Sequence, residues 1–358
     1  MKKTLFIMVA ILIIPSAIIC AEQQLAESQM ANLYVVTTLP DYAFFARVIG
    51  GDRVSVKAIV RGDQDAHFIR PKPSFATAMR NADVLVATGL DLELWLQTVI
   101  DSSGNGRIRS GQTGYVSVSA GINLLEKPKT ISRAEGGVHI YGNPHITCSP
   151  INMKTAAYNI ATGLIKNDPA DKQIYLQNLK NLHQQIDERL FGSKLVEMIG
   201  SDTLCSLAEQ DKLIPFLQEH KVEGKPLIEY LDGWIKKMLP LRGTPIVTYH
   251  KNWIYFLKLF GLEEAGTVEP KPGIPPSPKH VANLIRMMRE RNIGIILAAN
   301  YFDEQKIKTV ANRTDAEAVI VPLYIGGVAD IDDYFELVDY WVDGLLKAAE
   351  KKGLLKNY

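Results

Sequence analysis

The stretch "LYVVTTLPDYAFFARVIGG" (33–51) decides the fold class, because it contains the first strand and the first helix of a repeating alternation. Residues 33–40 form a short β-branched, apolar run that ends at a proline, which is typical of a strand. Residues 41–51 predict a helix with Asp41 as its N-cap and Gly50-Gly51 as its end. Strand–helix pairs of this kind indicate βα units and a mostly parallel sheet.

The same alternation continues along the chain and resumes after a different middle part. Apolar runs predict further strands at 54–60, 83–89, 244–250, 293–300 and 317–324. Helical patterns lie at 74–82, 251–261, 280–292, 303–314 and 333–353, whereas the glycine-rich segment 102–114 predicts a surface loop. We therefore expect α/β architecture on both sides of the middle part.

The middle part is a long uninterrupted helical pattern. Residues 170–200 contain no proline and carry apolar residues close to helical spacing, and Asp168-Pro169 supplies a helix start. The prediction is two α/β lobes with mostly parallel sheets, joined by one long rigid connector helix. The N-terminal lobe would span 32–168, the connector 169–198 and the C-terminal lobe 199–358.

The N-terminus "MKKTLFIMVAILIIPSAIICAEQQ" (1–24) has two lysines, an apolar run and small residues, in that order. This order is typical of a secretory signal peptide, here residues 1–21, with cleavage after Ala21. The alternatives are a transmembrane anchor, which Pro15 disfavours, and a lipoprotein modified at Cys20, which the bulky Ile19 disfavours. We expect an exported periplasmic protein without a lipid anchor.

Composition excludes some partners and leaves the cysteines open. The 358-residue chain has a formal net charge of +1, which disfavours a nucleic-acid partner because such proteins need a basic face. After cleavage two cysteines remain, Cys148 and Cys205. An exported protein can form a disulfide, so a Cys148–Cys205 bond and two free thiols are both open.

Three of the seven histidines lie where an α/β sheet normally places functional groups: His67, His145 and His250. His67 follows the strand 54–60, His250 ends the strand 244–250, and His145 lies in the loop "YGNPHITCSP" (141–150). Ligands of open α/β sheets bind beyond the carboxyl ends of strands, and neutral imidazoles are common zinc ligands. The long separations form no local motif, so three unrelated surface histidines remain an alternative.

Other candidate groups carry weaker signals. His139 is either a weak secondary metal site or ordinary loop polarity, and we favour loop polarity. Carboxylates at 91–93 and 330–333 are expected to have surface or capping roles. No G-x-S-x-G motif occurs in the sequence.

Several segments together resemble the zinc/manganese ABC-transporter substrate-binding protein family, the TroA-like or cluster A-I group. "GDQDAHFIRPKPS" (62–74) resembles the family's first metal-histidine loop, with Ala66 where proline is usual. "GNPHITCSPINM" (142–153) resembles the second loop, with Ser149 in place of an aspartate, and "VTYHKNWIYFLKLFGLE" (247–263) resembles the third. "NADVLVATGLDLELWL" (81–96) and the connector "DPADKQIYLQNLKNLHQQID" (168–187) also match, so the resemblance covers nearly the whole mature chain.

The resemblance implies a metal ion held between the lobes by His67 and His145 of the first lobe and His250 of the second. The family's fourth ligand is a carboxylate, but Ala299 and Gly326 stand at its two usual positions. Water, Asp303 or Asp65 could fill the fourth position, and we favour water. Three histidines without a carboxylate suit zinc better than manganese, because Mn²⁺ prefers oxygen ligands.

The implied function is therefore transport rather than catalysis. We expect a monomeric periplasmic receptor that captures Zn²⁺, with Mn²⁺ as the alternative ion, and delivers it to an inner-membrane ABC permease. An exported zinc hydrolase and an exported adhesin are the less favoured alternatives.

Overall fold

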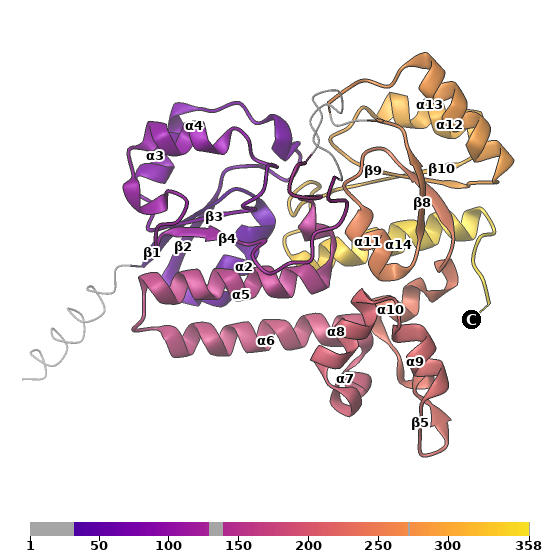
Figure 1. The fold of residues 1–358 in the computed structure, drawn as a ribbon, viewed down its shortest axis with the longest axis horizontal. Coiled ribbons are helices and arrows are strands. Elements are labelled where there is room, and N and C mark those ends of the chain that lie inside the picture. The colour runs from indigo at the N-terminus through magenta and orange to yellow at the C-terminus, as the bar shows by residue number, and fades with distance from the viewer. Residues whose placement is uncertain (1–31, 129–138, 271–272, 358) are drawn as a thin grey trace, which may run out of the picture. The chain divides into compact units, whose positions relative to one another are not determined.

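Two four-stranded parallel sheets carry the fold (Figure 1). The computed structural model describes residues 32–128, 139–270 and 273–357. The predicted signal peptide (1–21), with Cys20, lies outside the described residues. Among the helices that are described, none combines the length and the apolar character needed to cross a membrane. The predicted α/β fold class is confirmed.

The first sheet has the strand order β2-β1-β3-β4. Its strands are β1 (Leu33–Thr37), β2 (Val54–Ala58), β3 (Val84–Ala87) and β4 (Tyr115–Ser117). The connecting helices are α2 (Pro40–Gly50), α3 (Pro73–Arg80) and α4 (Leu96–Ser103). The sequence did not predict β4, which has three residues and follows the segment expected to be a loop. Asp41 is not the N-cap of α2: that position is Leu39, and Asp41 lies in the first turn.

The second sheet has the order β10-β9-β7-β8. Its strands are β7 (Pro245–Thr248), β8 (Glu263–Thr267), β9 (Ile295–Ala299) and β10 (Glu317–Val321). The helices of this half are α11 (Ile254–Phe260), α12 (Pro278–Glu290), α13 (Glu304–Thr314) and α14 (Tyr334–Lys351). Every predicted strand and helix of this half is present, and β8 is an additional strand that the sequence did not predict.

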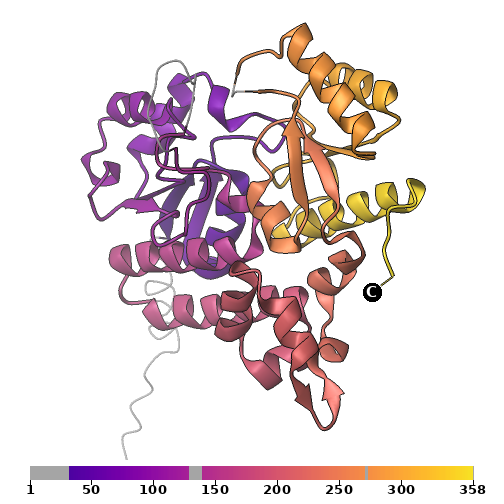
Figure 2. The ribbon, with the colours of Figure 1, turned by 45° about the vertical axis from the view of Figure 1, so that its right-hand side comes forward.

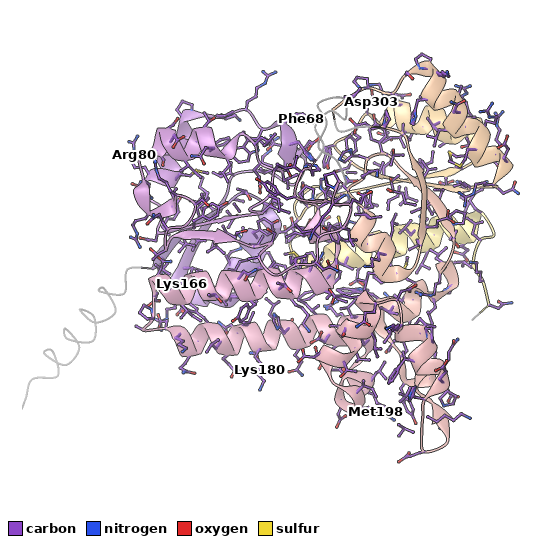
Figure 3. The ribbon with its side chains drawn as sticks, in the orientation of Figure 1. Phe68, Arg80, Lys166, Lys180, Met198 and Asp303 are labelled. Carbon is purple, nitrogen blue, oxygen red and sulfur yellow. The ribbon has the colours of Figure 1, made fainter. Side chains whose placement is uncertain are left out.

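The connector helix is present as α6 (Lys172–Phe191), but it is shorter than expected. Gly192 ends it with φ +85°, and the chain continues as α7 (Ser193–Ile199) and α8 (Ser201–Glu209). An additional helix, α5 (Pro150–Asn167), runs beside α6 and packs on it, and both helices also contact α2 (Figures 1 and 3). Lys166 marks the end of α5 and Lys180 the middle of α6 in Figure 3.

Smaller elements complete the described chain (Figure 2). Between α8 and β7 lie α9 (Leu213–Glu219), the hairpin of β5 (Lys221–Val222) and β6 (Lys225–Pro226), and α10 (Gly233–Met238). Short 3₁₀ helices are η1 (Gly51–Arg53), η2 (Ala66–Phe68), η3 (Gly106–Ile108), η5 (Ile146–Cys148), η6 (Leu227–Tyr230) and η7 (Leu239–Leu241). The lobe boundaries at 32–168 and 199–358 stay a prediction.

The two cysteines of the predicted mature chain do not form a disulfide. Cys148 and Cys205 are both buried free thiols. Cys148 lies in η5, and burial raises its pKa well above the ordinary value. Cys205 lies in α8, close to the Lys154–Asp187 ion pair.

Candidate metal site

His67 is held in place by a carboxylate two residues before it. Asp65 precedes η2, and its Oδ1 accepts hydrogen bonds from the His67 backbone N–H at 3.0 Å and from the ring Nδ1 at 2.7 Å. Burial raises the pKa of Asp65, but the hydrogen bonds from His67 and the proximity of His67 and His250 outweigh it, so the net shift is downward. Because a carboxylate only accepts, Nδ1 carries the proton and Nε2 is left with a free lone pair.

His145 is positioned by a loop that is tied to the second half of the chain. The His145 N–H donates to Asn143 Oδ1 at 3.0 Å. Asn143 Nδ2 donates to the Lys251 carbonyl at 2.6 Å, and the Asn143 carbonyl accepts from the Tyr255 hydroxyl at 2.6 Å. Asn143 therefore fixes His145 relative to the segment that follows β7.

The ring of His145 is buried without a hydrogen-bond partner. The residue is 2% exposed, and neither ring nitrogen has a partner among the described residues. Burial lowers the pKa of His145 well below its ordinary value, and nearby His67, His250 and His139 lower it further. Such a ring stays neutral, and an unpartnered buried nitrogen costs free energy unless a ligand occupies it. His145 therefore has the character of a metal ligand.

His250 and its partner lie beyond the carboxyl ends of two adjacent parallel strands. His250 follows β7 by two residues, and Glu269 follows β8 by two residues. The His250 Nδ1 lies 3.0 Å from Glu269 Oε2, and both side chains are largely buried. As at His67, the carboxylate orients the ring and leaves Nε2 free.

The structure brings the three predicted histidines together. Ring centroids lie 5.1 Å apart for His67 and His145, 5.6 Å for His67 and His250, and 5.5 Å for His145 and His250. His67 and His250 come from loops that follow strands of different sheets. The rings of His67, His145 and His250 are therefore neighbours, but the group of described residues whose ring nitrogens all lie within 4.8 Å of one another does not include His250.

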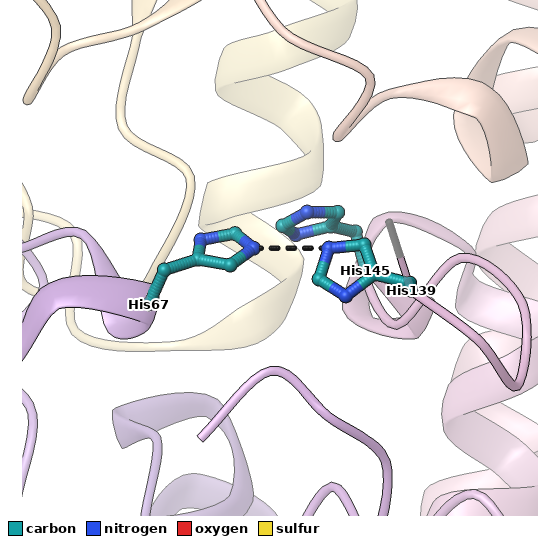
Figure 4. Close-up of side chains that lie close together, drawn as sticks. All are labelled: His67, His139 and His145. Atoms are coloured by element: carbon teal, nitrogen blue, oxygen red, sulfur yellow. Dashed lines mark hydrogen bonds between the residues drawn. The ribbon is translucent and has the colours of Figure 1, made fainter. Parts of the chain in front are cut away.

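A further histidine, His139, lies beside His67 and His145 (Figure 4). His139 Nε2 lies 3.2 Å from His67 Nε2, and one ring nitrogen from each of His67, His139 and His145 lies within 4.8 Å of the others. His139 Nδ1 lies 3.0 Å from Asp91 Oδ1, beyond the end of β3. The interpretation of His139 as loop polarity does not fit this placement, because its ring turns inward to the other histidines.

The carboxylates at 91–93 also differ from the expectation of surface or capping roles. Asp91 binds His139, and Glu93 is buried and accepts hydrogen bonds from the Thr38 and Thr88 hydroxyls, each at 2.7 Å. The sequence feature that points to Asp91 is its position after a strand, which it shares with His67 and His250. The signal for His139 was its distance of only six residues from His145.

The remaining described histidines lie elsewhere and have other partners. His183 lies 3.0 Å from the Lys154 carbonyl, and His280 lies 2.9 Å from the Thr267 carbonyl. His220 is exposed and stacks on Phe216 with ring centroids 4.2 Å apart. These three serve as natural controls for the cluster.

Comparisons with known proteins identify the family and the relatives of this chain. The family described as "Zinc-uptake complex component A periplasmic" (ZnuA) matches residues 35–189 and 225–348. A manganese ABC transporter substrate-binding lipoprotein, PsaA of Streptococcus anginosus, is 21% identical and covers 98% of this chain and 100% of its own. The high-affinity zinc uptake system protein ZnuA of Bacillus subtilis is 24% identical over 92% of this chain and 84% of its own.

Solved structures share the fold. A zinc-bound deletion mutant of ZnuA has a TM-score of 0.64 at 21% identity and covers 88% of this chain and 98% of its own. A manganese-bound periplasmic metal-binding protein from Candidatus Liberibacter asiaticus has a TM-score of 0.62 at 18% identity and covers 88% and 99%.

The family match and the relatives define the class of this protein: it is a metal-binding receptor of an ABC importer that works outside the cytoplasm, and not an enzyme. Within that class, the chain belongs to the ZnuA family, the periplasmic zinc-uptake component A. The family resemblance of the sequence is thereby confirmed.

Proposed function

We propose that the chain captures one Zn²⁺ ion between its two lobes, with His67, His145 and His250 as ligands. The observation that carries this proposal is His145, whose two buried ring nitrogens lack partners although other imidazoles surround the ring. Leaving buried nitrogens without a partner costs free energy, and a divalent cation bound to one of them would remove part of that cost. Carboxylates already hold the rings of His67 and His250.

Zinc is favoured over manganese by the chemistry of the donors. The clustered groups that face one another are imidazoles, and imidazole suits zinc, whereas carboxylate and water suit Mn²⁺. Asp65 and Glu269 each face a ring Nδ1 and so are engaged in orienting histidines. Relatives are named for zinc and for manganese, so the preference for zinc proposed here rests on the donor set and not on the relatives' names.

We propose that the receptor is a periplasmic monomer that hands its ion to an inner-membrane ABC permease. The signal-like segment 1–21 and the family description support export. Streptococcal relatives are named lipoproteins, and Cys20 is the cysteine available for that modification. We expect cleavage after Ala21; the intact mass of the mature protein checks this, and a diacylglyceryl adduct on Cys20 would contradict it.

The ligand set is tested by replacing its members one at a time. The variants His67→Ala, His145→Ala and His250→Ala are titrated with Zn²⁺ by calorimetry, beside His220→Ala, whose ring is exposed and distant from the cluster. Each ligand variant should lose on the order of 100-fold or more in zinc affinity, whereas His220→Ala should match the wild type. Wild-type affinity in His250→Ala would refute a site shared by both lobes.

A further inference from the structure

The three proposed ligands fill three positions of a tetrahedral zinc site and leave the fourth without a protein donor. Asp65 Oδ1 is engaged with His67, and Asp303 is exposed and caps α13 by accepting from the N–H groups of Gln305 and Lys306. Ala299 is the last residue of β9 and offers no donor side chain. Asp303 and Ala299 therefore do not provide the missing ligand, and Asp65 already uses one oxygen to orient His67.

His139 lies at the distance that a fourth ligand needs. Two nitrogens bound to one tetrahedral zinc, each about 2.0–2.1 Å from the ion, lie about 3.3 Å apart. The Nε2 atoms of His67 and His139 are 3.2 Å apart, and the His139 and His145 ring centroids are 5.9 Å apart. The pair therefore forms one edge of a tetrahedron that His145 can share.

The carboxylate partners of His67 and His139 indicate which nitrogens carry protons at the short Nε2–Nε2 contact. Asp65 accepts from Nδ1 of His67 and Asp91 accepts from Nδ1 of His139, so Nδ1 holds the proton in both neutral rings. Both Nε2 atoms then present lone pairs to each other at 3.2 Å. Two acceptors face each other favourably only when a cation lies between them, either a proton or a metal ion.

Asp91 holds His139 at two points. Its Oδ1 accepts from the ring and its Oδ2 accepts from the Ile140 backbone N–H at 3.0 Å. Asp91 lies beyond β3 and Asp65 beyond β2, two strands of the same sheet. A carboxylate at Nδ1 thus orients His139, as it does for His67 and His250. The family's usual carboxylate ligand is absent, because Ala299 and Gly326 stand at its two positions.

We propose that His139 is the fourth metal ligand and that Asp91 is its positioning residue, so that the ion is bound by four imidazoles. This inference rests on the proposed zinc-receptor function and adds its coordination chemistry. An all-nitrogen, four-coordinate site discriminates against Mn²⁺, which prefers oxygen ligands in octahedral geometry. His139 would therefore determine specificity as well as affinity.

The test measures ligand number and selectivity on the full mature chain. X-ray absorption of the zinc-loaded wild type should give about four imidazole nitrogens, and His139→Ala should give about three plus one oxygen. The ratio of zinc to manganese affinity should fall at least about tenfold in His139→Ala and stay unchanged in His220→Ala. An unchanged imidazole number and an unchanged ratio in His139→Ala would overturn the inference.

Asp91→Asn provides a second variant that keeps His139. Zinc affinity should fall by about 10–100-fold while the unfolding temperature of the metal-free protein stays within a few degrees, and Asp91→Glu should restore part of the affinity. Wild-type zinc affinity in Asp91→Asn would remove its positioning role. Failure of the wild type itself to bind zinc would overturn the receptor proposal, whereas tight zinc binding with three imidazoles in the wild type would overturn only the inference about His139.

Discussion

At the scale of residues, carboxylates set the chemistry of the clustered imidazoles. Asp65, Asp91 and Glu269 each face the Nδ1 of one histidine, at 2.7, 3.0 and 3.0 Å. The carboxylate fixes the tautomer and the orientation of each ring, and it makes the other nitrogen a better ligand. The fourth ring, His145, lacks such a partner and depends on burial to remain neutral.

Glu269→Gln should weaken zinc binding without removing a ligand. The amide keeps the shape of the side chain but loses the negative charge that favours a metal on His250, so we expect affinity to fall about 10–100-fold. Competition with a chromophoric chelator measures the change. Glu263→Gln is the matched control, because Glu263 pairs with Arg291 on the surface and should leave affinity unchanged. Equal affinity in both variants would contradict the orienting role.

Replacement of Asp41 should stabilise the protein by an amount that depends on pH. Burial raises its pKa to about 7, against the N–H groups of Asp41 and Ile325, which lower it. The folded state therefore binds a proton more tightly than the unfolded state, and stability falls as pH rises through about 7. Asp41→Asn should add about 2–4 kcal/mol to the free energy of unfolding at pH 8.

The gain from Asp41→Asn should shrink to roughly half at pH 5, because there the folded wild type already carries the proton on Asp41. Urea unfolding at both pH values measures it. The exposed Asp332→Asn should change stability by less than about 0.5 kcal/mol at either pH. A gain that is the same at pH 5 and pH 8 would show that the carboxyl does not titrate as proposed.

At the scale of elements, the ends of helices and strands place the site. His67 follows β2, Asp91 follows β3, His250 follows β7 and Glu269 follows β8. Parallel strands direct their carboxyl ends to one edge of each sheet, so these residues gather there. Helix α5 packs on β3 and β4 of the first sheet, α6 packs on α5, and Gly192 marks the point where α6 ends and α7 begins.

Gly192 and Gly200 give a matched test of that junction. Both have φ near +86° (+85° and +87°), a region that non-glycine residues rarely adopt, so each change to alanine should cost about 1–3 kcal/mol. An added Cβ at Gly192 would also lie 2.6 Å from Asp232 Cβ, whereas none of the described atoms lies within 4 Å at Gly200. Gly192→Ala should therefore lower the free energy of unfolding by at least about 1 kcal/mol more than Gly200→Ala.

Chemical denaturation of metal-free protein measures both glycine variants. Zinc stoichiometry should remain one ion per chain in each, because neither substitution changes a residue of the histidine loops. Equal destabilisation by the two substitutions would show that the contact with Asp232 is relieved without cost.

Strand and helix patterns made the elements of both sheets predictable, but not all of them. The apolar, β-branched runs of β1, β2, β3, β7, β9 and β10 predict strands, whereas β4 has three residues and β8 (EEAGT) is polar. Tertiary packing determines such strands, since pairing with β3 and β7 supplies the hydrogen bonds. The long helix was predicted without its break, because a single glycine is tolerated in helical patterns.

The candidate site was predictable in its loops but not in its partners. The motifs around His67, His145 and His250 identified three histidines, which the structure brings together. His139 could not be assigned, because its environment depends on Asp91, 48 residues away along the chain. Pairings of that kind follow from the register of the sheet and from loop paths, which residue spacing does not encode.

At the scale of the whole molecule, contacts between the two halves hold the histidine loops together. The Lys251 ammonium donates to Glu126 at 2.6 Å, and the Tyr334 hydroxyl donates to the Thr147 carbonyl at 2.7 Å. Together with the bonds of Asn143, they join the segment before α5 to the segments of α11 and α14. Metal affinity should therefore depend on both halves of the chain.

Zinc binding should weaken as pH falls. Metal and proton compete for the same imidazole nitrogens, so affinity should be nearly flat above about pH 7 and fall by at least about tenfold per unit below about pH 6. His145 contributes little to this loss, because its lowered pKa keeps it neutral to lower pH than an ordinary histidine. Dissociation constants measured from pH 8 to pH 5 test this, and a constant affinity down to pH 5 would exclude imidazole ligands.

We propose that this receptor binds zinc through clustered imidazoles. The most direct measurement is calorimetric titration of the metal-free mature chain with Zn²⁺ and, separately, with Mn²⁺ at pH 7.5. We predict one zinc ion per chain, bound much more tightly than manganese, because nitrogen donors suit zinc. Tight stoichiometric binding of Mn²⁺ together with weak binding of Zn²⁺ would contradict zinc as the transported ion.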